Sequence, residues 1–166
     1  MTGTTRHTAA IDWRRDGAPF TDSRFSRRHY WRFDGGARIV ASLSPAMLPE
    51  PMADPSGVDP EEALVAAAAS CHMLWFLTLA AADGFVVDSY RDEPWGEMGP
   101  IGGRRLAFTR IALHPRTAFA GCAPPDAEAL RALHDRAGRR CFIANSLIAE
   151  VTCEPSFAEA PAGSGP

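Results

Sequence analysis

Hydrophobic and polar positions over the first third of the chain follow a pattern that predicts strands and turns. Residues 29–33 form an aromatic, strand-like run, residues 34–36 are the turn signal Asp-Gly-Gly, and residues 37–41 continue as a second strand. Four prolines between Ser44 and Gly57 predict a loop. The chain up to about residue 57 is therefore expected to consist of strands and turns.

A long apolar stretch follows and predicts the central element of the fold. Asp59 is a favourable N-cap, Pro60 suits a first helical turn, and the next two residues are glutamates that match the positive end of a helix dipole. The alanine-rich run predicts a helix to about Ala82, which Gly84 is placed to end. Its polar members are Ser70, Cys71, His72 and Thr78. We interpret it as a buried central helix and not as a membrane span.

The second half of the chain mixes strand and helix patterns. Residues 85–90 and 106–115 predict strands, and Asp126 is placed to cap a helix with apolar residues at helical spacing. These apolar residues are Ala129, Leu130, Leu133 and Ala137, and Gly138 interrupts the pattern after them. A last helix is expected from about Arg140 to Ile148, and residues 151–154 predict a closing strand.

This order of elements predicts an α+β fold in which one long helix packs on antiparallel sheet. We expect a single domain over residues 1–157. Residues 158–166 are small, acidic and proline-containing, and predict a disordered tail.

Composition narrows the function classes without choosing one. A net charge of −3 gives no reason to expect nucleic acid or an anionic membrane as a partner. All 17 basic residues are arginine, so Schiff-base chemistry through a lysine is excluded. The polar start of the chain has no apolar segment of a signal peptide, and we therefore expect a cytoplasmic location. In that compartment four cysteines indicate free or catalytic thiols better than a disulfide framework.

Two of the cysteines carry the most informative pattern. Cys71 and Cys141 each belong to a mostly apolar, helix-forming stretch, and only the fold can bring them together across 70 residues. If it does, the chain holds a two-thiol redox centre, which suggests peroxide chemistry. The competing interpretation is that each is a small core residue, the common fate of a free cysteine. Cys122, in a turn, and Cys153, in a strand, are interpreted as structural.

No metal site and no cofactor are expected from the spacing of potential ligands. No two cysteines are close enough in sequence to form a chelating loop, and no two histidines form an i, i+4 pair. The histidines are His7, His29, His72, His114 and His134. His72 cannot act as a base on Cys71 through adjacency, because successive helical side chains point about 100° apart. We interpret it as a partly buried helix residue.

Three blocks of residues match a known family, and the resemblance runs from about residue 10 to 154. The first is Asp59-Pro60-Glu61-Glu62-Ala63-Leu64 with Ser70-Cys71-His72-Met73-Leu74-Trp75, the second is Cys141-Phe142-Ile143-Ala144-Asn145-Ser146-Leu147, and the third is Phe25-Ser26-Arg27-Arg28-His29. In these blocks the chain resembles the OsmC/Ohr family of thiol-dependent hydroperoxide reductases.

The resemblance implies a fold, an activity and partners. The fold is an intertwined homodimer in which each subunit gives antiparallel sheet and a long central helix. By position, Cys71 resembles the peroxidatic cysteine, Cys141 the resolving cysteine and Glu61 the acidic partner of an arginine. Arg27 is assigned as that arginine, with Arg28 and Arg24 as alternatives. The implied substrate is an organic hydroperoxide, and the implied reductant is a lipoyl-type or small dithiol that reopens a Cys71–Cys141 disulfide.

A second class of function remains open from the residues themselves. A non-redox helix-on-sheet protein, such as a small acyl-thioester hydrolase or a ligand-binding module, would use aspartate or glutamate chemistry. Such a protein would not need both Cys71 and Cys141, and serine should be tolerated at each position.

Overall fold

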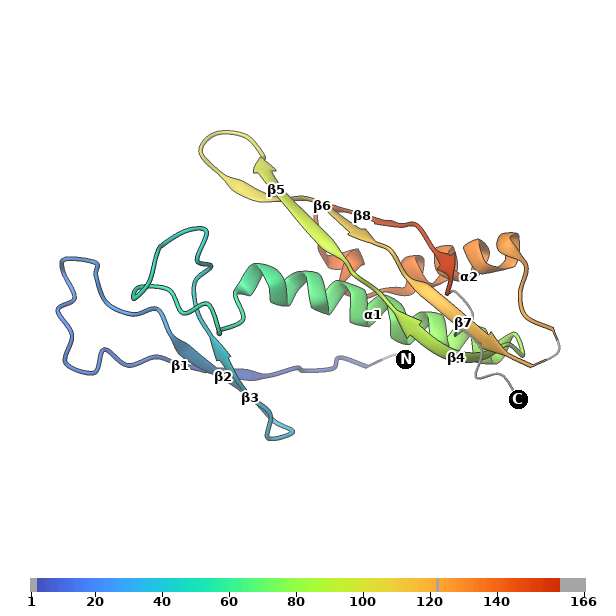
Figure 1. Cartoon of the computed structure of the whole chain (residues 1–166), viewed down its shortest axis with the longest axis horizontal. Helices are drawn as coiled ribbons and strands as arrows, with labels where there is room; N and C mark the ends of the chain where they lie inside the picture. Colours follow the sequence, from blue (N-terminus) through green and yellow to red (C-terminus); the bar gives the residue numbers. More distant parts are fainter. Residues whose placement is uncertain (1–2, 122, 159–166) are drawn as a thin grey trace, which may run out of the picture. The chain divides into compact units, whose positions relative to one another are not determined.

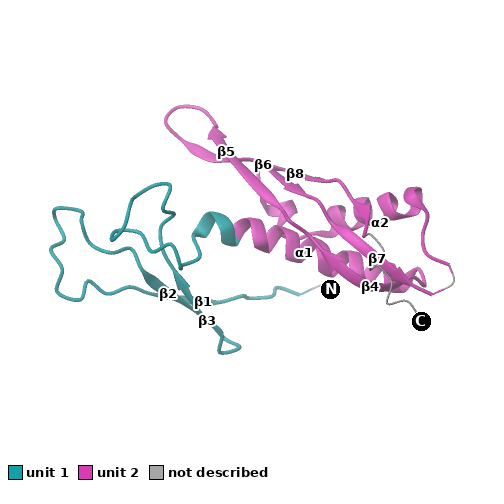
Figure 2. Ribbon diagram, in the orientation of Figure 1, with its two compact units in different colours: residues 1–63 teal, residues 64–166 magenta. Residues whose placement is uncertain are grey.

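The computed structural model describes residues 3–121 and 123–158, which form two compact units (Figures 1 and 2). Unit 1 covers Met1–Ala63 and unit 2 covers Leu64–Pro166. The single domain expected over residues 1–157 stays a prediction. The disordered tail is expected over residues 158–166. Only its first residue, Ala158, belongs to the described part of the chain, and residues 159–166 lie outside it.

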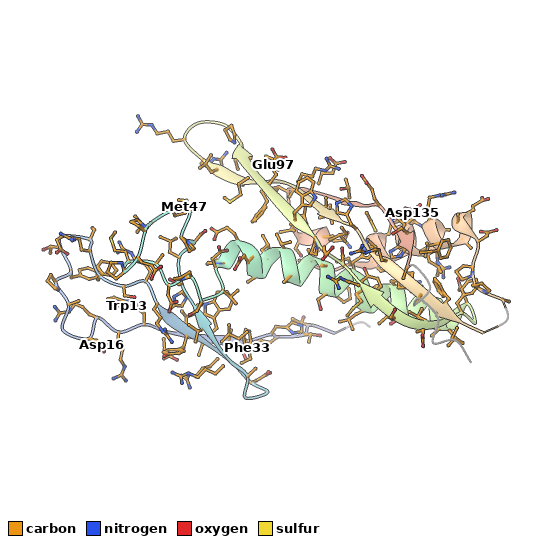
Figure 3. All side chains as sticks on the ribbon, in the orientation of Figure 1. Trp13, Asp16, Phe33, Met47, Glu97 and Asp135 are labelled. Carbon is orange, nitrogen blue, oxygen red and sulfur yellow. The ribbon has the colours of Figure 1, made fainter. Side chains whose placement is uncertain are left out.

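Unit 1 is built on a three-stranded antiparallel sheet of β1 (Ala9–Asp12), β2 (His29–Phe33) and β3 (Arg38–Ala41). The strands predicted at 29–33 and 37–41 are confirmed. Gly36 takes a positive φ of 86° in the turn between them, a backbone conformation that favours glycine. Before β2, Trp13 contacts the rings of Phe20 and Phe25, and those two rings stack at 4.6 Å (Figure 3).

The long helix α1 (Pro60–Ala82) begins and ends where its sequence predicts. Asp59 and Glu62 form a reciprocal capping box: the Glu62 N–H donates to Asp59 Oδ1 at 2.7 Å, and the Asp59 N–H donates to Glu62 Oε2 at 3.2 Å. At the other end Gly84 has a φ of 84°, and the Phe85 N–H donates to the Ala80 carbonyl at 2.9 Å. This is the Schellman arrangement that closes a helix.

The sheets of unit 2 confirm the α+β class and correct its details. One sheet has the order β4-β7-β9 and the other has the order β5-β6-β8. The strands are β4 (Val86–Arg91), β5 (Trp95–Pro100), β6 (Leu106–Leu113), β7 (Arg116–Ala120), β8 (Glu150–Cys153) and β9 (Ser156–Phe157). β4 pairs with β7 and β5 pairs with β6 in antiparallel orientation, whereas β8 joins β6 and β9 joins β7 in parallel. The expectation of antiparallel sheet alone was therefore wrong at these two joins.

The second helix, α2 (Ala127–Arg140), corrects two further predictions. Asp126 is the N-cap as predicted, and its side chain accepts from the Ala129 N–H at 2.8 Å. Gly138 does not interrupt the helix, which continues to Arg140. The helix expected over 140–148 is wrong, because that stretch holds only a short 3₁₀ turn, η1 (Ala144–Ser146). Cys141 is instead the C-cap of α2.

The core of unit 2 forms where α1 packs against α2 and the sheets. Phe76, Leu79 and Ala80 of α1 are buried with Leu130 and Leu133 of α2. A second cluster joins α1 to β6 through residues such as Ala68 and Ile111. By length and composition alone, α1 could cross a membrane, and 33% of its most apolar stretch is buried inside the structure. The buried residues of α1 belong to the two core clusters that it forms with α2 and β6.

Candidate active site

The structure brings the two predicted thiols together within unit 2. Cys71 lies on α1 and is half-buried, whereas Cys141 is 1% exposed at the end of α2. The two thiols lie close enough for the Cys71 side chain to raise the pKa of Cys141. The Cys141 thiol also donates to the Ala68 carbonyl at 3.8 Å, and the Ala144 N–H donates to Cys141 Sγ at 3.4 Å. We call Cys71 and Cys141 the dithiol pair.

The environment of Cys141 keeps its sulfur protonated at neutral pH. Burial is the main cause that raises the pKa of the Cys141 thiol to about 11; the Ala144 N–H acts against it, and the neighbouring Cys71 side chain adds to it. Because the thiolate is the nucleophilic form of cysteine, Cys141 is poorly suited to make the first attack on a substrate. Its position suits a thiol that reacts second.

Aromatic and basic side chains lie around Trp75, one helical turn after Cys71 on α1. The Trp75 ring meets Phe142 edge-on, with centroids 5.6 Å apart, and the Arg140 guanidinium lies 5.5 Å from the Trp75 ring centroid. Phe142 is 60% exposed and Leu74 is 58% exposed. Sequence analysis missed Arg140, because an arginine beside a cysteine gives no sign of where its guanidinium lies.

Arg27 and Glu61 both belong to unit 1, but the structure does not pair them. The Arg27 guanidinium donates to the Ser23 carbonyl at 2.6 Å and the Phe25 carbonyl at 2.5 Å, and it lies 4.0 Å from the Phe25 ring centroid. No ion pair joins it to Glu61 within residues 3–121 and 123–158. Glu61 Oε2 is buried and has no hydrogen-bond partner in this described part of the chain.

Of the two alternative arginines, one forms an ion pair and the other is exposed to solvent. Arg28 forms an ion pair with Asp54 at 2.6 Å, and Arg24 is exposed. An apolar cavity of about 380 Å³ lies in unit 1 beside Arg27, lined mainly by Trp13, Phe25 and their neighbours. Arg27 is thus the one of the three predicted arginines that lines this cavity.

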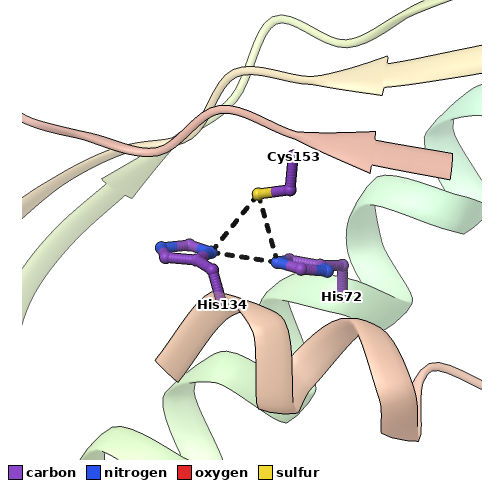
Figure 4. Close-up of side chains that lie close together, drawn as sticks. All are labelled: His72, His134 and Cys153. Carbon is purple, nitrogen blue, oxygen red and sulfur yellow. Dashed lines mark hydrogen bonds between the residues drawn. The ribbon is translucent and has the colours of Figure 1, made fainter. Parts of the chain in front are cut away.

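The sequence predicted no cluster of metal ligands, but the structure contains a second group of side chains that could hold a metal ion. His72 of α1, His134 of α2 and Cys153 of β8 meet in unit 2 (Figure 4). His72 Nε2 lies 2.9 Å from His134 Nδ1, and Cys153 Sγ lies 3.6 Å from each of these nitrogens. We call these three residues the imidazole–thiol cluster. Sequence spacing missed it because its members come from three separate elements.

Burial keeps all three members of the imidazole–thiol cluster uncharged. It lowers the pKa of His72 to about 4, and, with the neighbouring His72, lowers that of His134 to about 3. Burial also raises the pKa of the Cys153 thiol to about 12, with further contributions from Asp92, Asp135 and Glu154. The two imidazoles are therefore neutral at physiological pH, which leaves nitrogen lone pairs available.

Comparison with known proteins identifies the family. The family model described as "OsmC-like protein" matches residues 53–156, so the chain belongs to the OsmC-like family. None of the functionally curated protein sequences matches it.

Solved structures show the same fold. An OsmC-like protein of unknown function from Vibrio cholerae is 42% identical, with a TM-score of 0.89 over 92% of this chain and 100% of that one. An organic hydroperoxide resistance protein from Legionella pneumophila is 13% identical, with a TM-score of 0.67 over 95% and 100% of the two chains. A second such protein, from Elizabethkingia anophelis, is 12% identical, with a TM-score of 0.68 over 96% and 100%.

Proposed function

We propose that this protein is a thiol-dependent peroxidase that reduces organic hydroperoxides to alcohols. The observation that carries the proposal is the proximity of the Cys71 and Cys141 side chains, which come from positions 70 residues apart in sequence and interact in the fold. A thiol pair in contact can form an intramolecular disulfide with little rearrangement. Membership of the OsmC-like family supports the choice of peroxide chemistry.

The proposed reaction begins at the more accessible sulfur. The Cys71 thiolate attacks the outer oxygen of the hydroperoxide, the O–O bond breaks, and the leaving alkoxide takes a proton to become the alcohol. Cys71 is then a sulfenic acid. The Cys141 thiol displaces its hydroxyl group as water, which forms the Cys71–Cys141 disulfide, and a lipoyl-type or small dithiol reduces this disulfide by exchange.

Arg27 and Glu61 enter the proposal through the family resemblance. Arg27 stabilises the Cys71 thiolate and the charge that develops on the peroxide oxygens, and Glu61 orients the guanidinium. The apolar cavity beside Arg27 supports an organic substrate, since its lining includes the rings of Trp13 and Phe25. On this basis Trp13→Ala should raise KM for a bulky organic hydroperoxide and leave KM for hydrogen peroxide unchanged.

A homodimer and a cytoplasmic location complete the proposal. The α1 helix is apolar around most of its circumference, and a helix of that kind is normally covered on all sides. In the single chain, however, Leu74 of α1 remains 58% exposed. A second copy of this chain would cover that side of α1, and light scattering on the purified protein measures whether it does.

The deciding experiment is a thiol count on reduced protein before and after one equivalent of cumene hydroperoxide, with disulfides mapped by peptide mass. Rapid loss of two thiols with a Cys71–Cys141 bridge is the expected result. Slow oxidation scattered over all four cysteines would contradict the proposal and favour a non-redox hydrolase or ligand-binding protein. Ser70→Ala, at the exposed neighbouring position on α1, is the matched control.

A further inference from the structure

We propose that His72, His134 and Cys153 form a metal site that binds one Zn²⁺ ion per chain, separate from the dithiol pair. The site would join α1, α2 and β8, the three elements that supply its ligands (Figure 4). The proposal is independent of peroxidase activity, because neither Cys71 nor Cys141 takes part in it.

The separations among the three ligand atoms fit tetrahedral zinc. With Zn–N bonds of about 2.0 to 2.1 Å and a Zn–S bond of about 2.3 Å, tetrahedral geometry separates nitrogen from sulfur by about 3.6 Å and nitrogen from nitrogen by about 3.3 Å. Both nitrogen–sulfur distances in the cluster are 3.6 Å. The nitrogen–nitrogen distance is 2.9 Å, so the two imidazoles would move apart by about 0.4 Å.

Hydrogen bonding alone does not satisfy this triangle of atoms. If His72 Nε2 carries the proton and donates to His134 Nδ1, it has no lone pair left to accept from the Cys153 thiol. The opposite tautomers create the same conflict at His134 Nδ1. In either case His134 Nε2 is buried without a partner within the described part of the chain. A cation at the centre would use a lone pair from all three atoms at once.

The surroundings of the cluster also favour a cation. Carboxylates of Asp92, Asp135 and Glu154 are close enough to act on the Cys153 sulfur. Besides His134 Nε2, the buried polar atoms without a hydrogen-bond partner in the described chain include Tyr90 Oη and Asp92 Oδ2. Tyr90 packs 6.3 Å from the His134 ring, between centroids, and the Asp92 carboxylate acts on the Cys153 sulfur, so both groups lie beside the cluster.

A route and a fourth ligand are available. A cavity of about 250 Å³ is lined by all three ligands and by Asp135 and Arg139, which are exposed residues of α2 (Figure 3 labels Asp135). Water or the Asp135 carboxylate would fill the fourth position. Among the described residues that line this cavity there is no methionine to act as the axial ligand typical of a blue-copper site, and the donor set of two imidazoles and one thiolate favours zinc.

Cobalt(II) tests the site, because a thiolate bound to Co²⁺ gives a charge-transfer band that zinc does not show. A variant with Cys71, Cys122 and Cys141 all replaced by serine keeps Cys153 as its single thiol. We expect it to bind one equivalent of Co²⁺ with that band, and Zn²⁺ to displace the cobalt. The further change Cys153→Ser, or His134→Ala, should abolish the band and weaken binding by more than the roughly 10- to 100-fold typical of losing an outer-shell partner.

A second measurement uses the unaltered protein and does not depend on variants folding. Zn²⁺ should protect Cys153 from alkylation, as mapped by peptide mass, and a chelator should remove the protection. Equal alkylation of Cys153 with and without Zn²⁺ would overturn the proposal. So would a folded single-thiol variant, checked by circular dichroism, that gives no thiolate band with Co²⁺. Neither outcome bears on the Cys71–Cys141 disulfide, so the two proposals fail separately.

Discussion

Cys71 and His72 are neighbours in the sequence, yet they belong to two different clusters of reactive side chains. Cys71 is half-buried and contacts Cys141, whereas His72 is 2% exposed and contacts His134 and Cys153. Successive side chains on a helix point about 100° apart, so one step along α1 moves from one cluster to the other. The chemistry expected of Cys141 and of Cys153 therefore depends on the groups around each sulfur. Cys141 lies beside another thiol, whereas Cys153 lies beside two imidazoles.

The two partner thiols differ in burial, since Cys141 is buried and Cys153 is half-buried, and in what contacts the sulfur. Cys141 is held by backbone groups of Ala68 and Ala144 and by another thiol. Cys153 is held by two imidazole nitrogens. A thiol next to a thiol can exchange electrons as a disulfide, while a thiol next to neutral imidazoles can share a cation. The predictions below test this division, beginning with the largest effect.

Replacing Cys71 should give the largest difference between the two clusters, because peroxide reduction is lost and Zn²⁺ binding is kept. Cys71→Ser is expected to lower the rate of hydroperoxide reduction by roughly a thousandfold or more, because it removes the attacking sulfur. It should leave Zn²⁺ affinity unchanged. Steady-state peroxide assays and metal titration on one preparation measure both quantities. Loss of metal binding together with activity would show that the clusters are not separate.

Replacing Cys141, the proposed resolving cysteine, should change the products of peroxide oxidation. Cys141→Ser should allow one stoichiometric round of peroxide reduction and then leave Cys71 open to over-oxidation, since no neighbouring thiol captures its sulfenic acid. Mass spectrometry after excess cumene hydroperoxide should find sulfinic or sulfonic acid at Cys71. Full turnover by this variant would remove Cys141 from the proposed mechanism.

Damage to the core should affect the imidazole–thiol cluster more than the dithiol pair. Phe76 is fully buried and stacks on His134 with ring centroids 4.1 Å apart. Phe76→Ala should lower the free energy of unfolding by about 3 to 5 kcal/mol and weaken Zn²⁺ binding. Urea unfolding and metal titration measure these effects. The matched control is Arg131→Ala at an exposed position of α2, expected to change stability by less than about 0.5 kcal/mol.

The pH dependence of stability should report the burial of Cys141. Its pKa is raised to about 11, so the folded protein keeps this proton at a pH where the unfolded chain releases it. Stability from this group is therefore complete below about pH 8.5 and is lost as pH rises toward about 11. For reduced protein we expect a loss on the order of 2 kcal/mol, measured by urea unfolding between about pH 8 and pH 10.5. A Cys141→Ala variant with an equally steep loss would contradict this assignment.

The smallest expected effect is a loss of stability in α2, the helix that contributes residues to both clusters. α2 carries His134 and ends at Cys141, and the Asp126 side chain caps its first turn. Asp126→Ala should cost about 1 kcal/mol of unfolding free energy, whereas Asp126→Asn should cost much less because asparagine also caps helices. Urea unfolding compares the two variants. A larger effect on only one cluster would show that α2 does not hold them as a unit.

Local signals in the sequence predicted the helices well and some strands poorly. The Asp59–Glu62 capping box and Gly84 gave the bounds of α1 because they act through neighbouring residues. β5 was not predicted, since Gly96, Gly99 and Pro100 all weaken a strand pattern. Gly96 is needed there because a Cβ would collide with the Phe108 ring, a contact that depends on the partner strand. Gly138 was misjudged because a glycine in a helix need not end it.

The candidate sites were predictable to the extent that a family pattern covered them. Resemblance indicated Cys71 and Cys141 as a pair, and the structure places them in contact. The roles of Arg27 and Glu61 stay predictions, because this chain alone does not pair them. His72, His134 and Cys153 could not be grouped from sequence, since 62 and 19 residues separate them and only tertiary packing closes those distances.

The edge-on contact between Trp75 and Phe142 has an optical consequence. Phe142 follows Cys141 directly in the chain, so formation of the proposed Cys71–Cys141 disulfide should shift its ring against Trp75. Disulfides quench indole fluorescence, and the Arg140 guanidinium already lies near the same indole ring. In the proposed cycle we therefore expect the emission of Trp75 to change as the thiols are oxidised and reduced, and stopped-flow fluorescence would measure the rates of both steps.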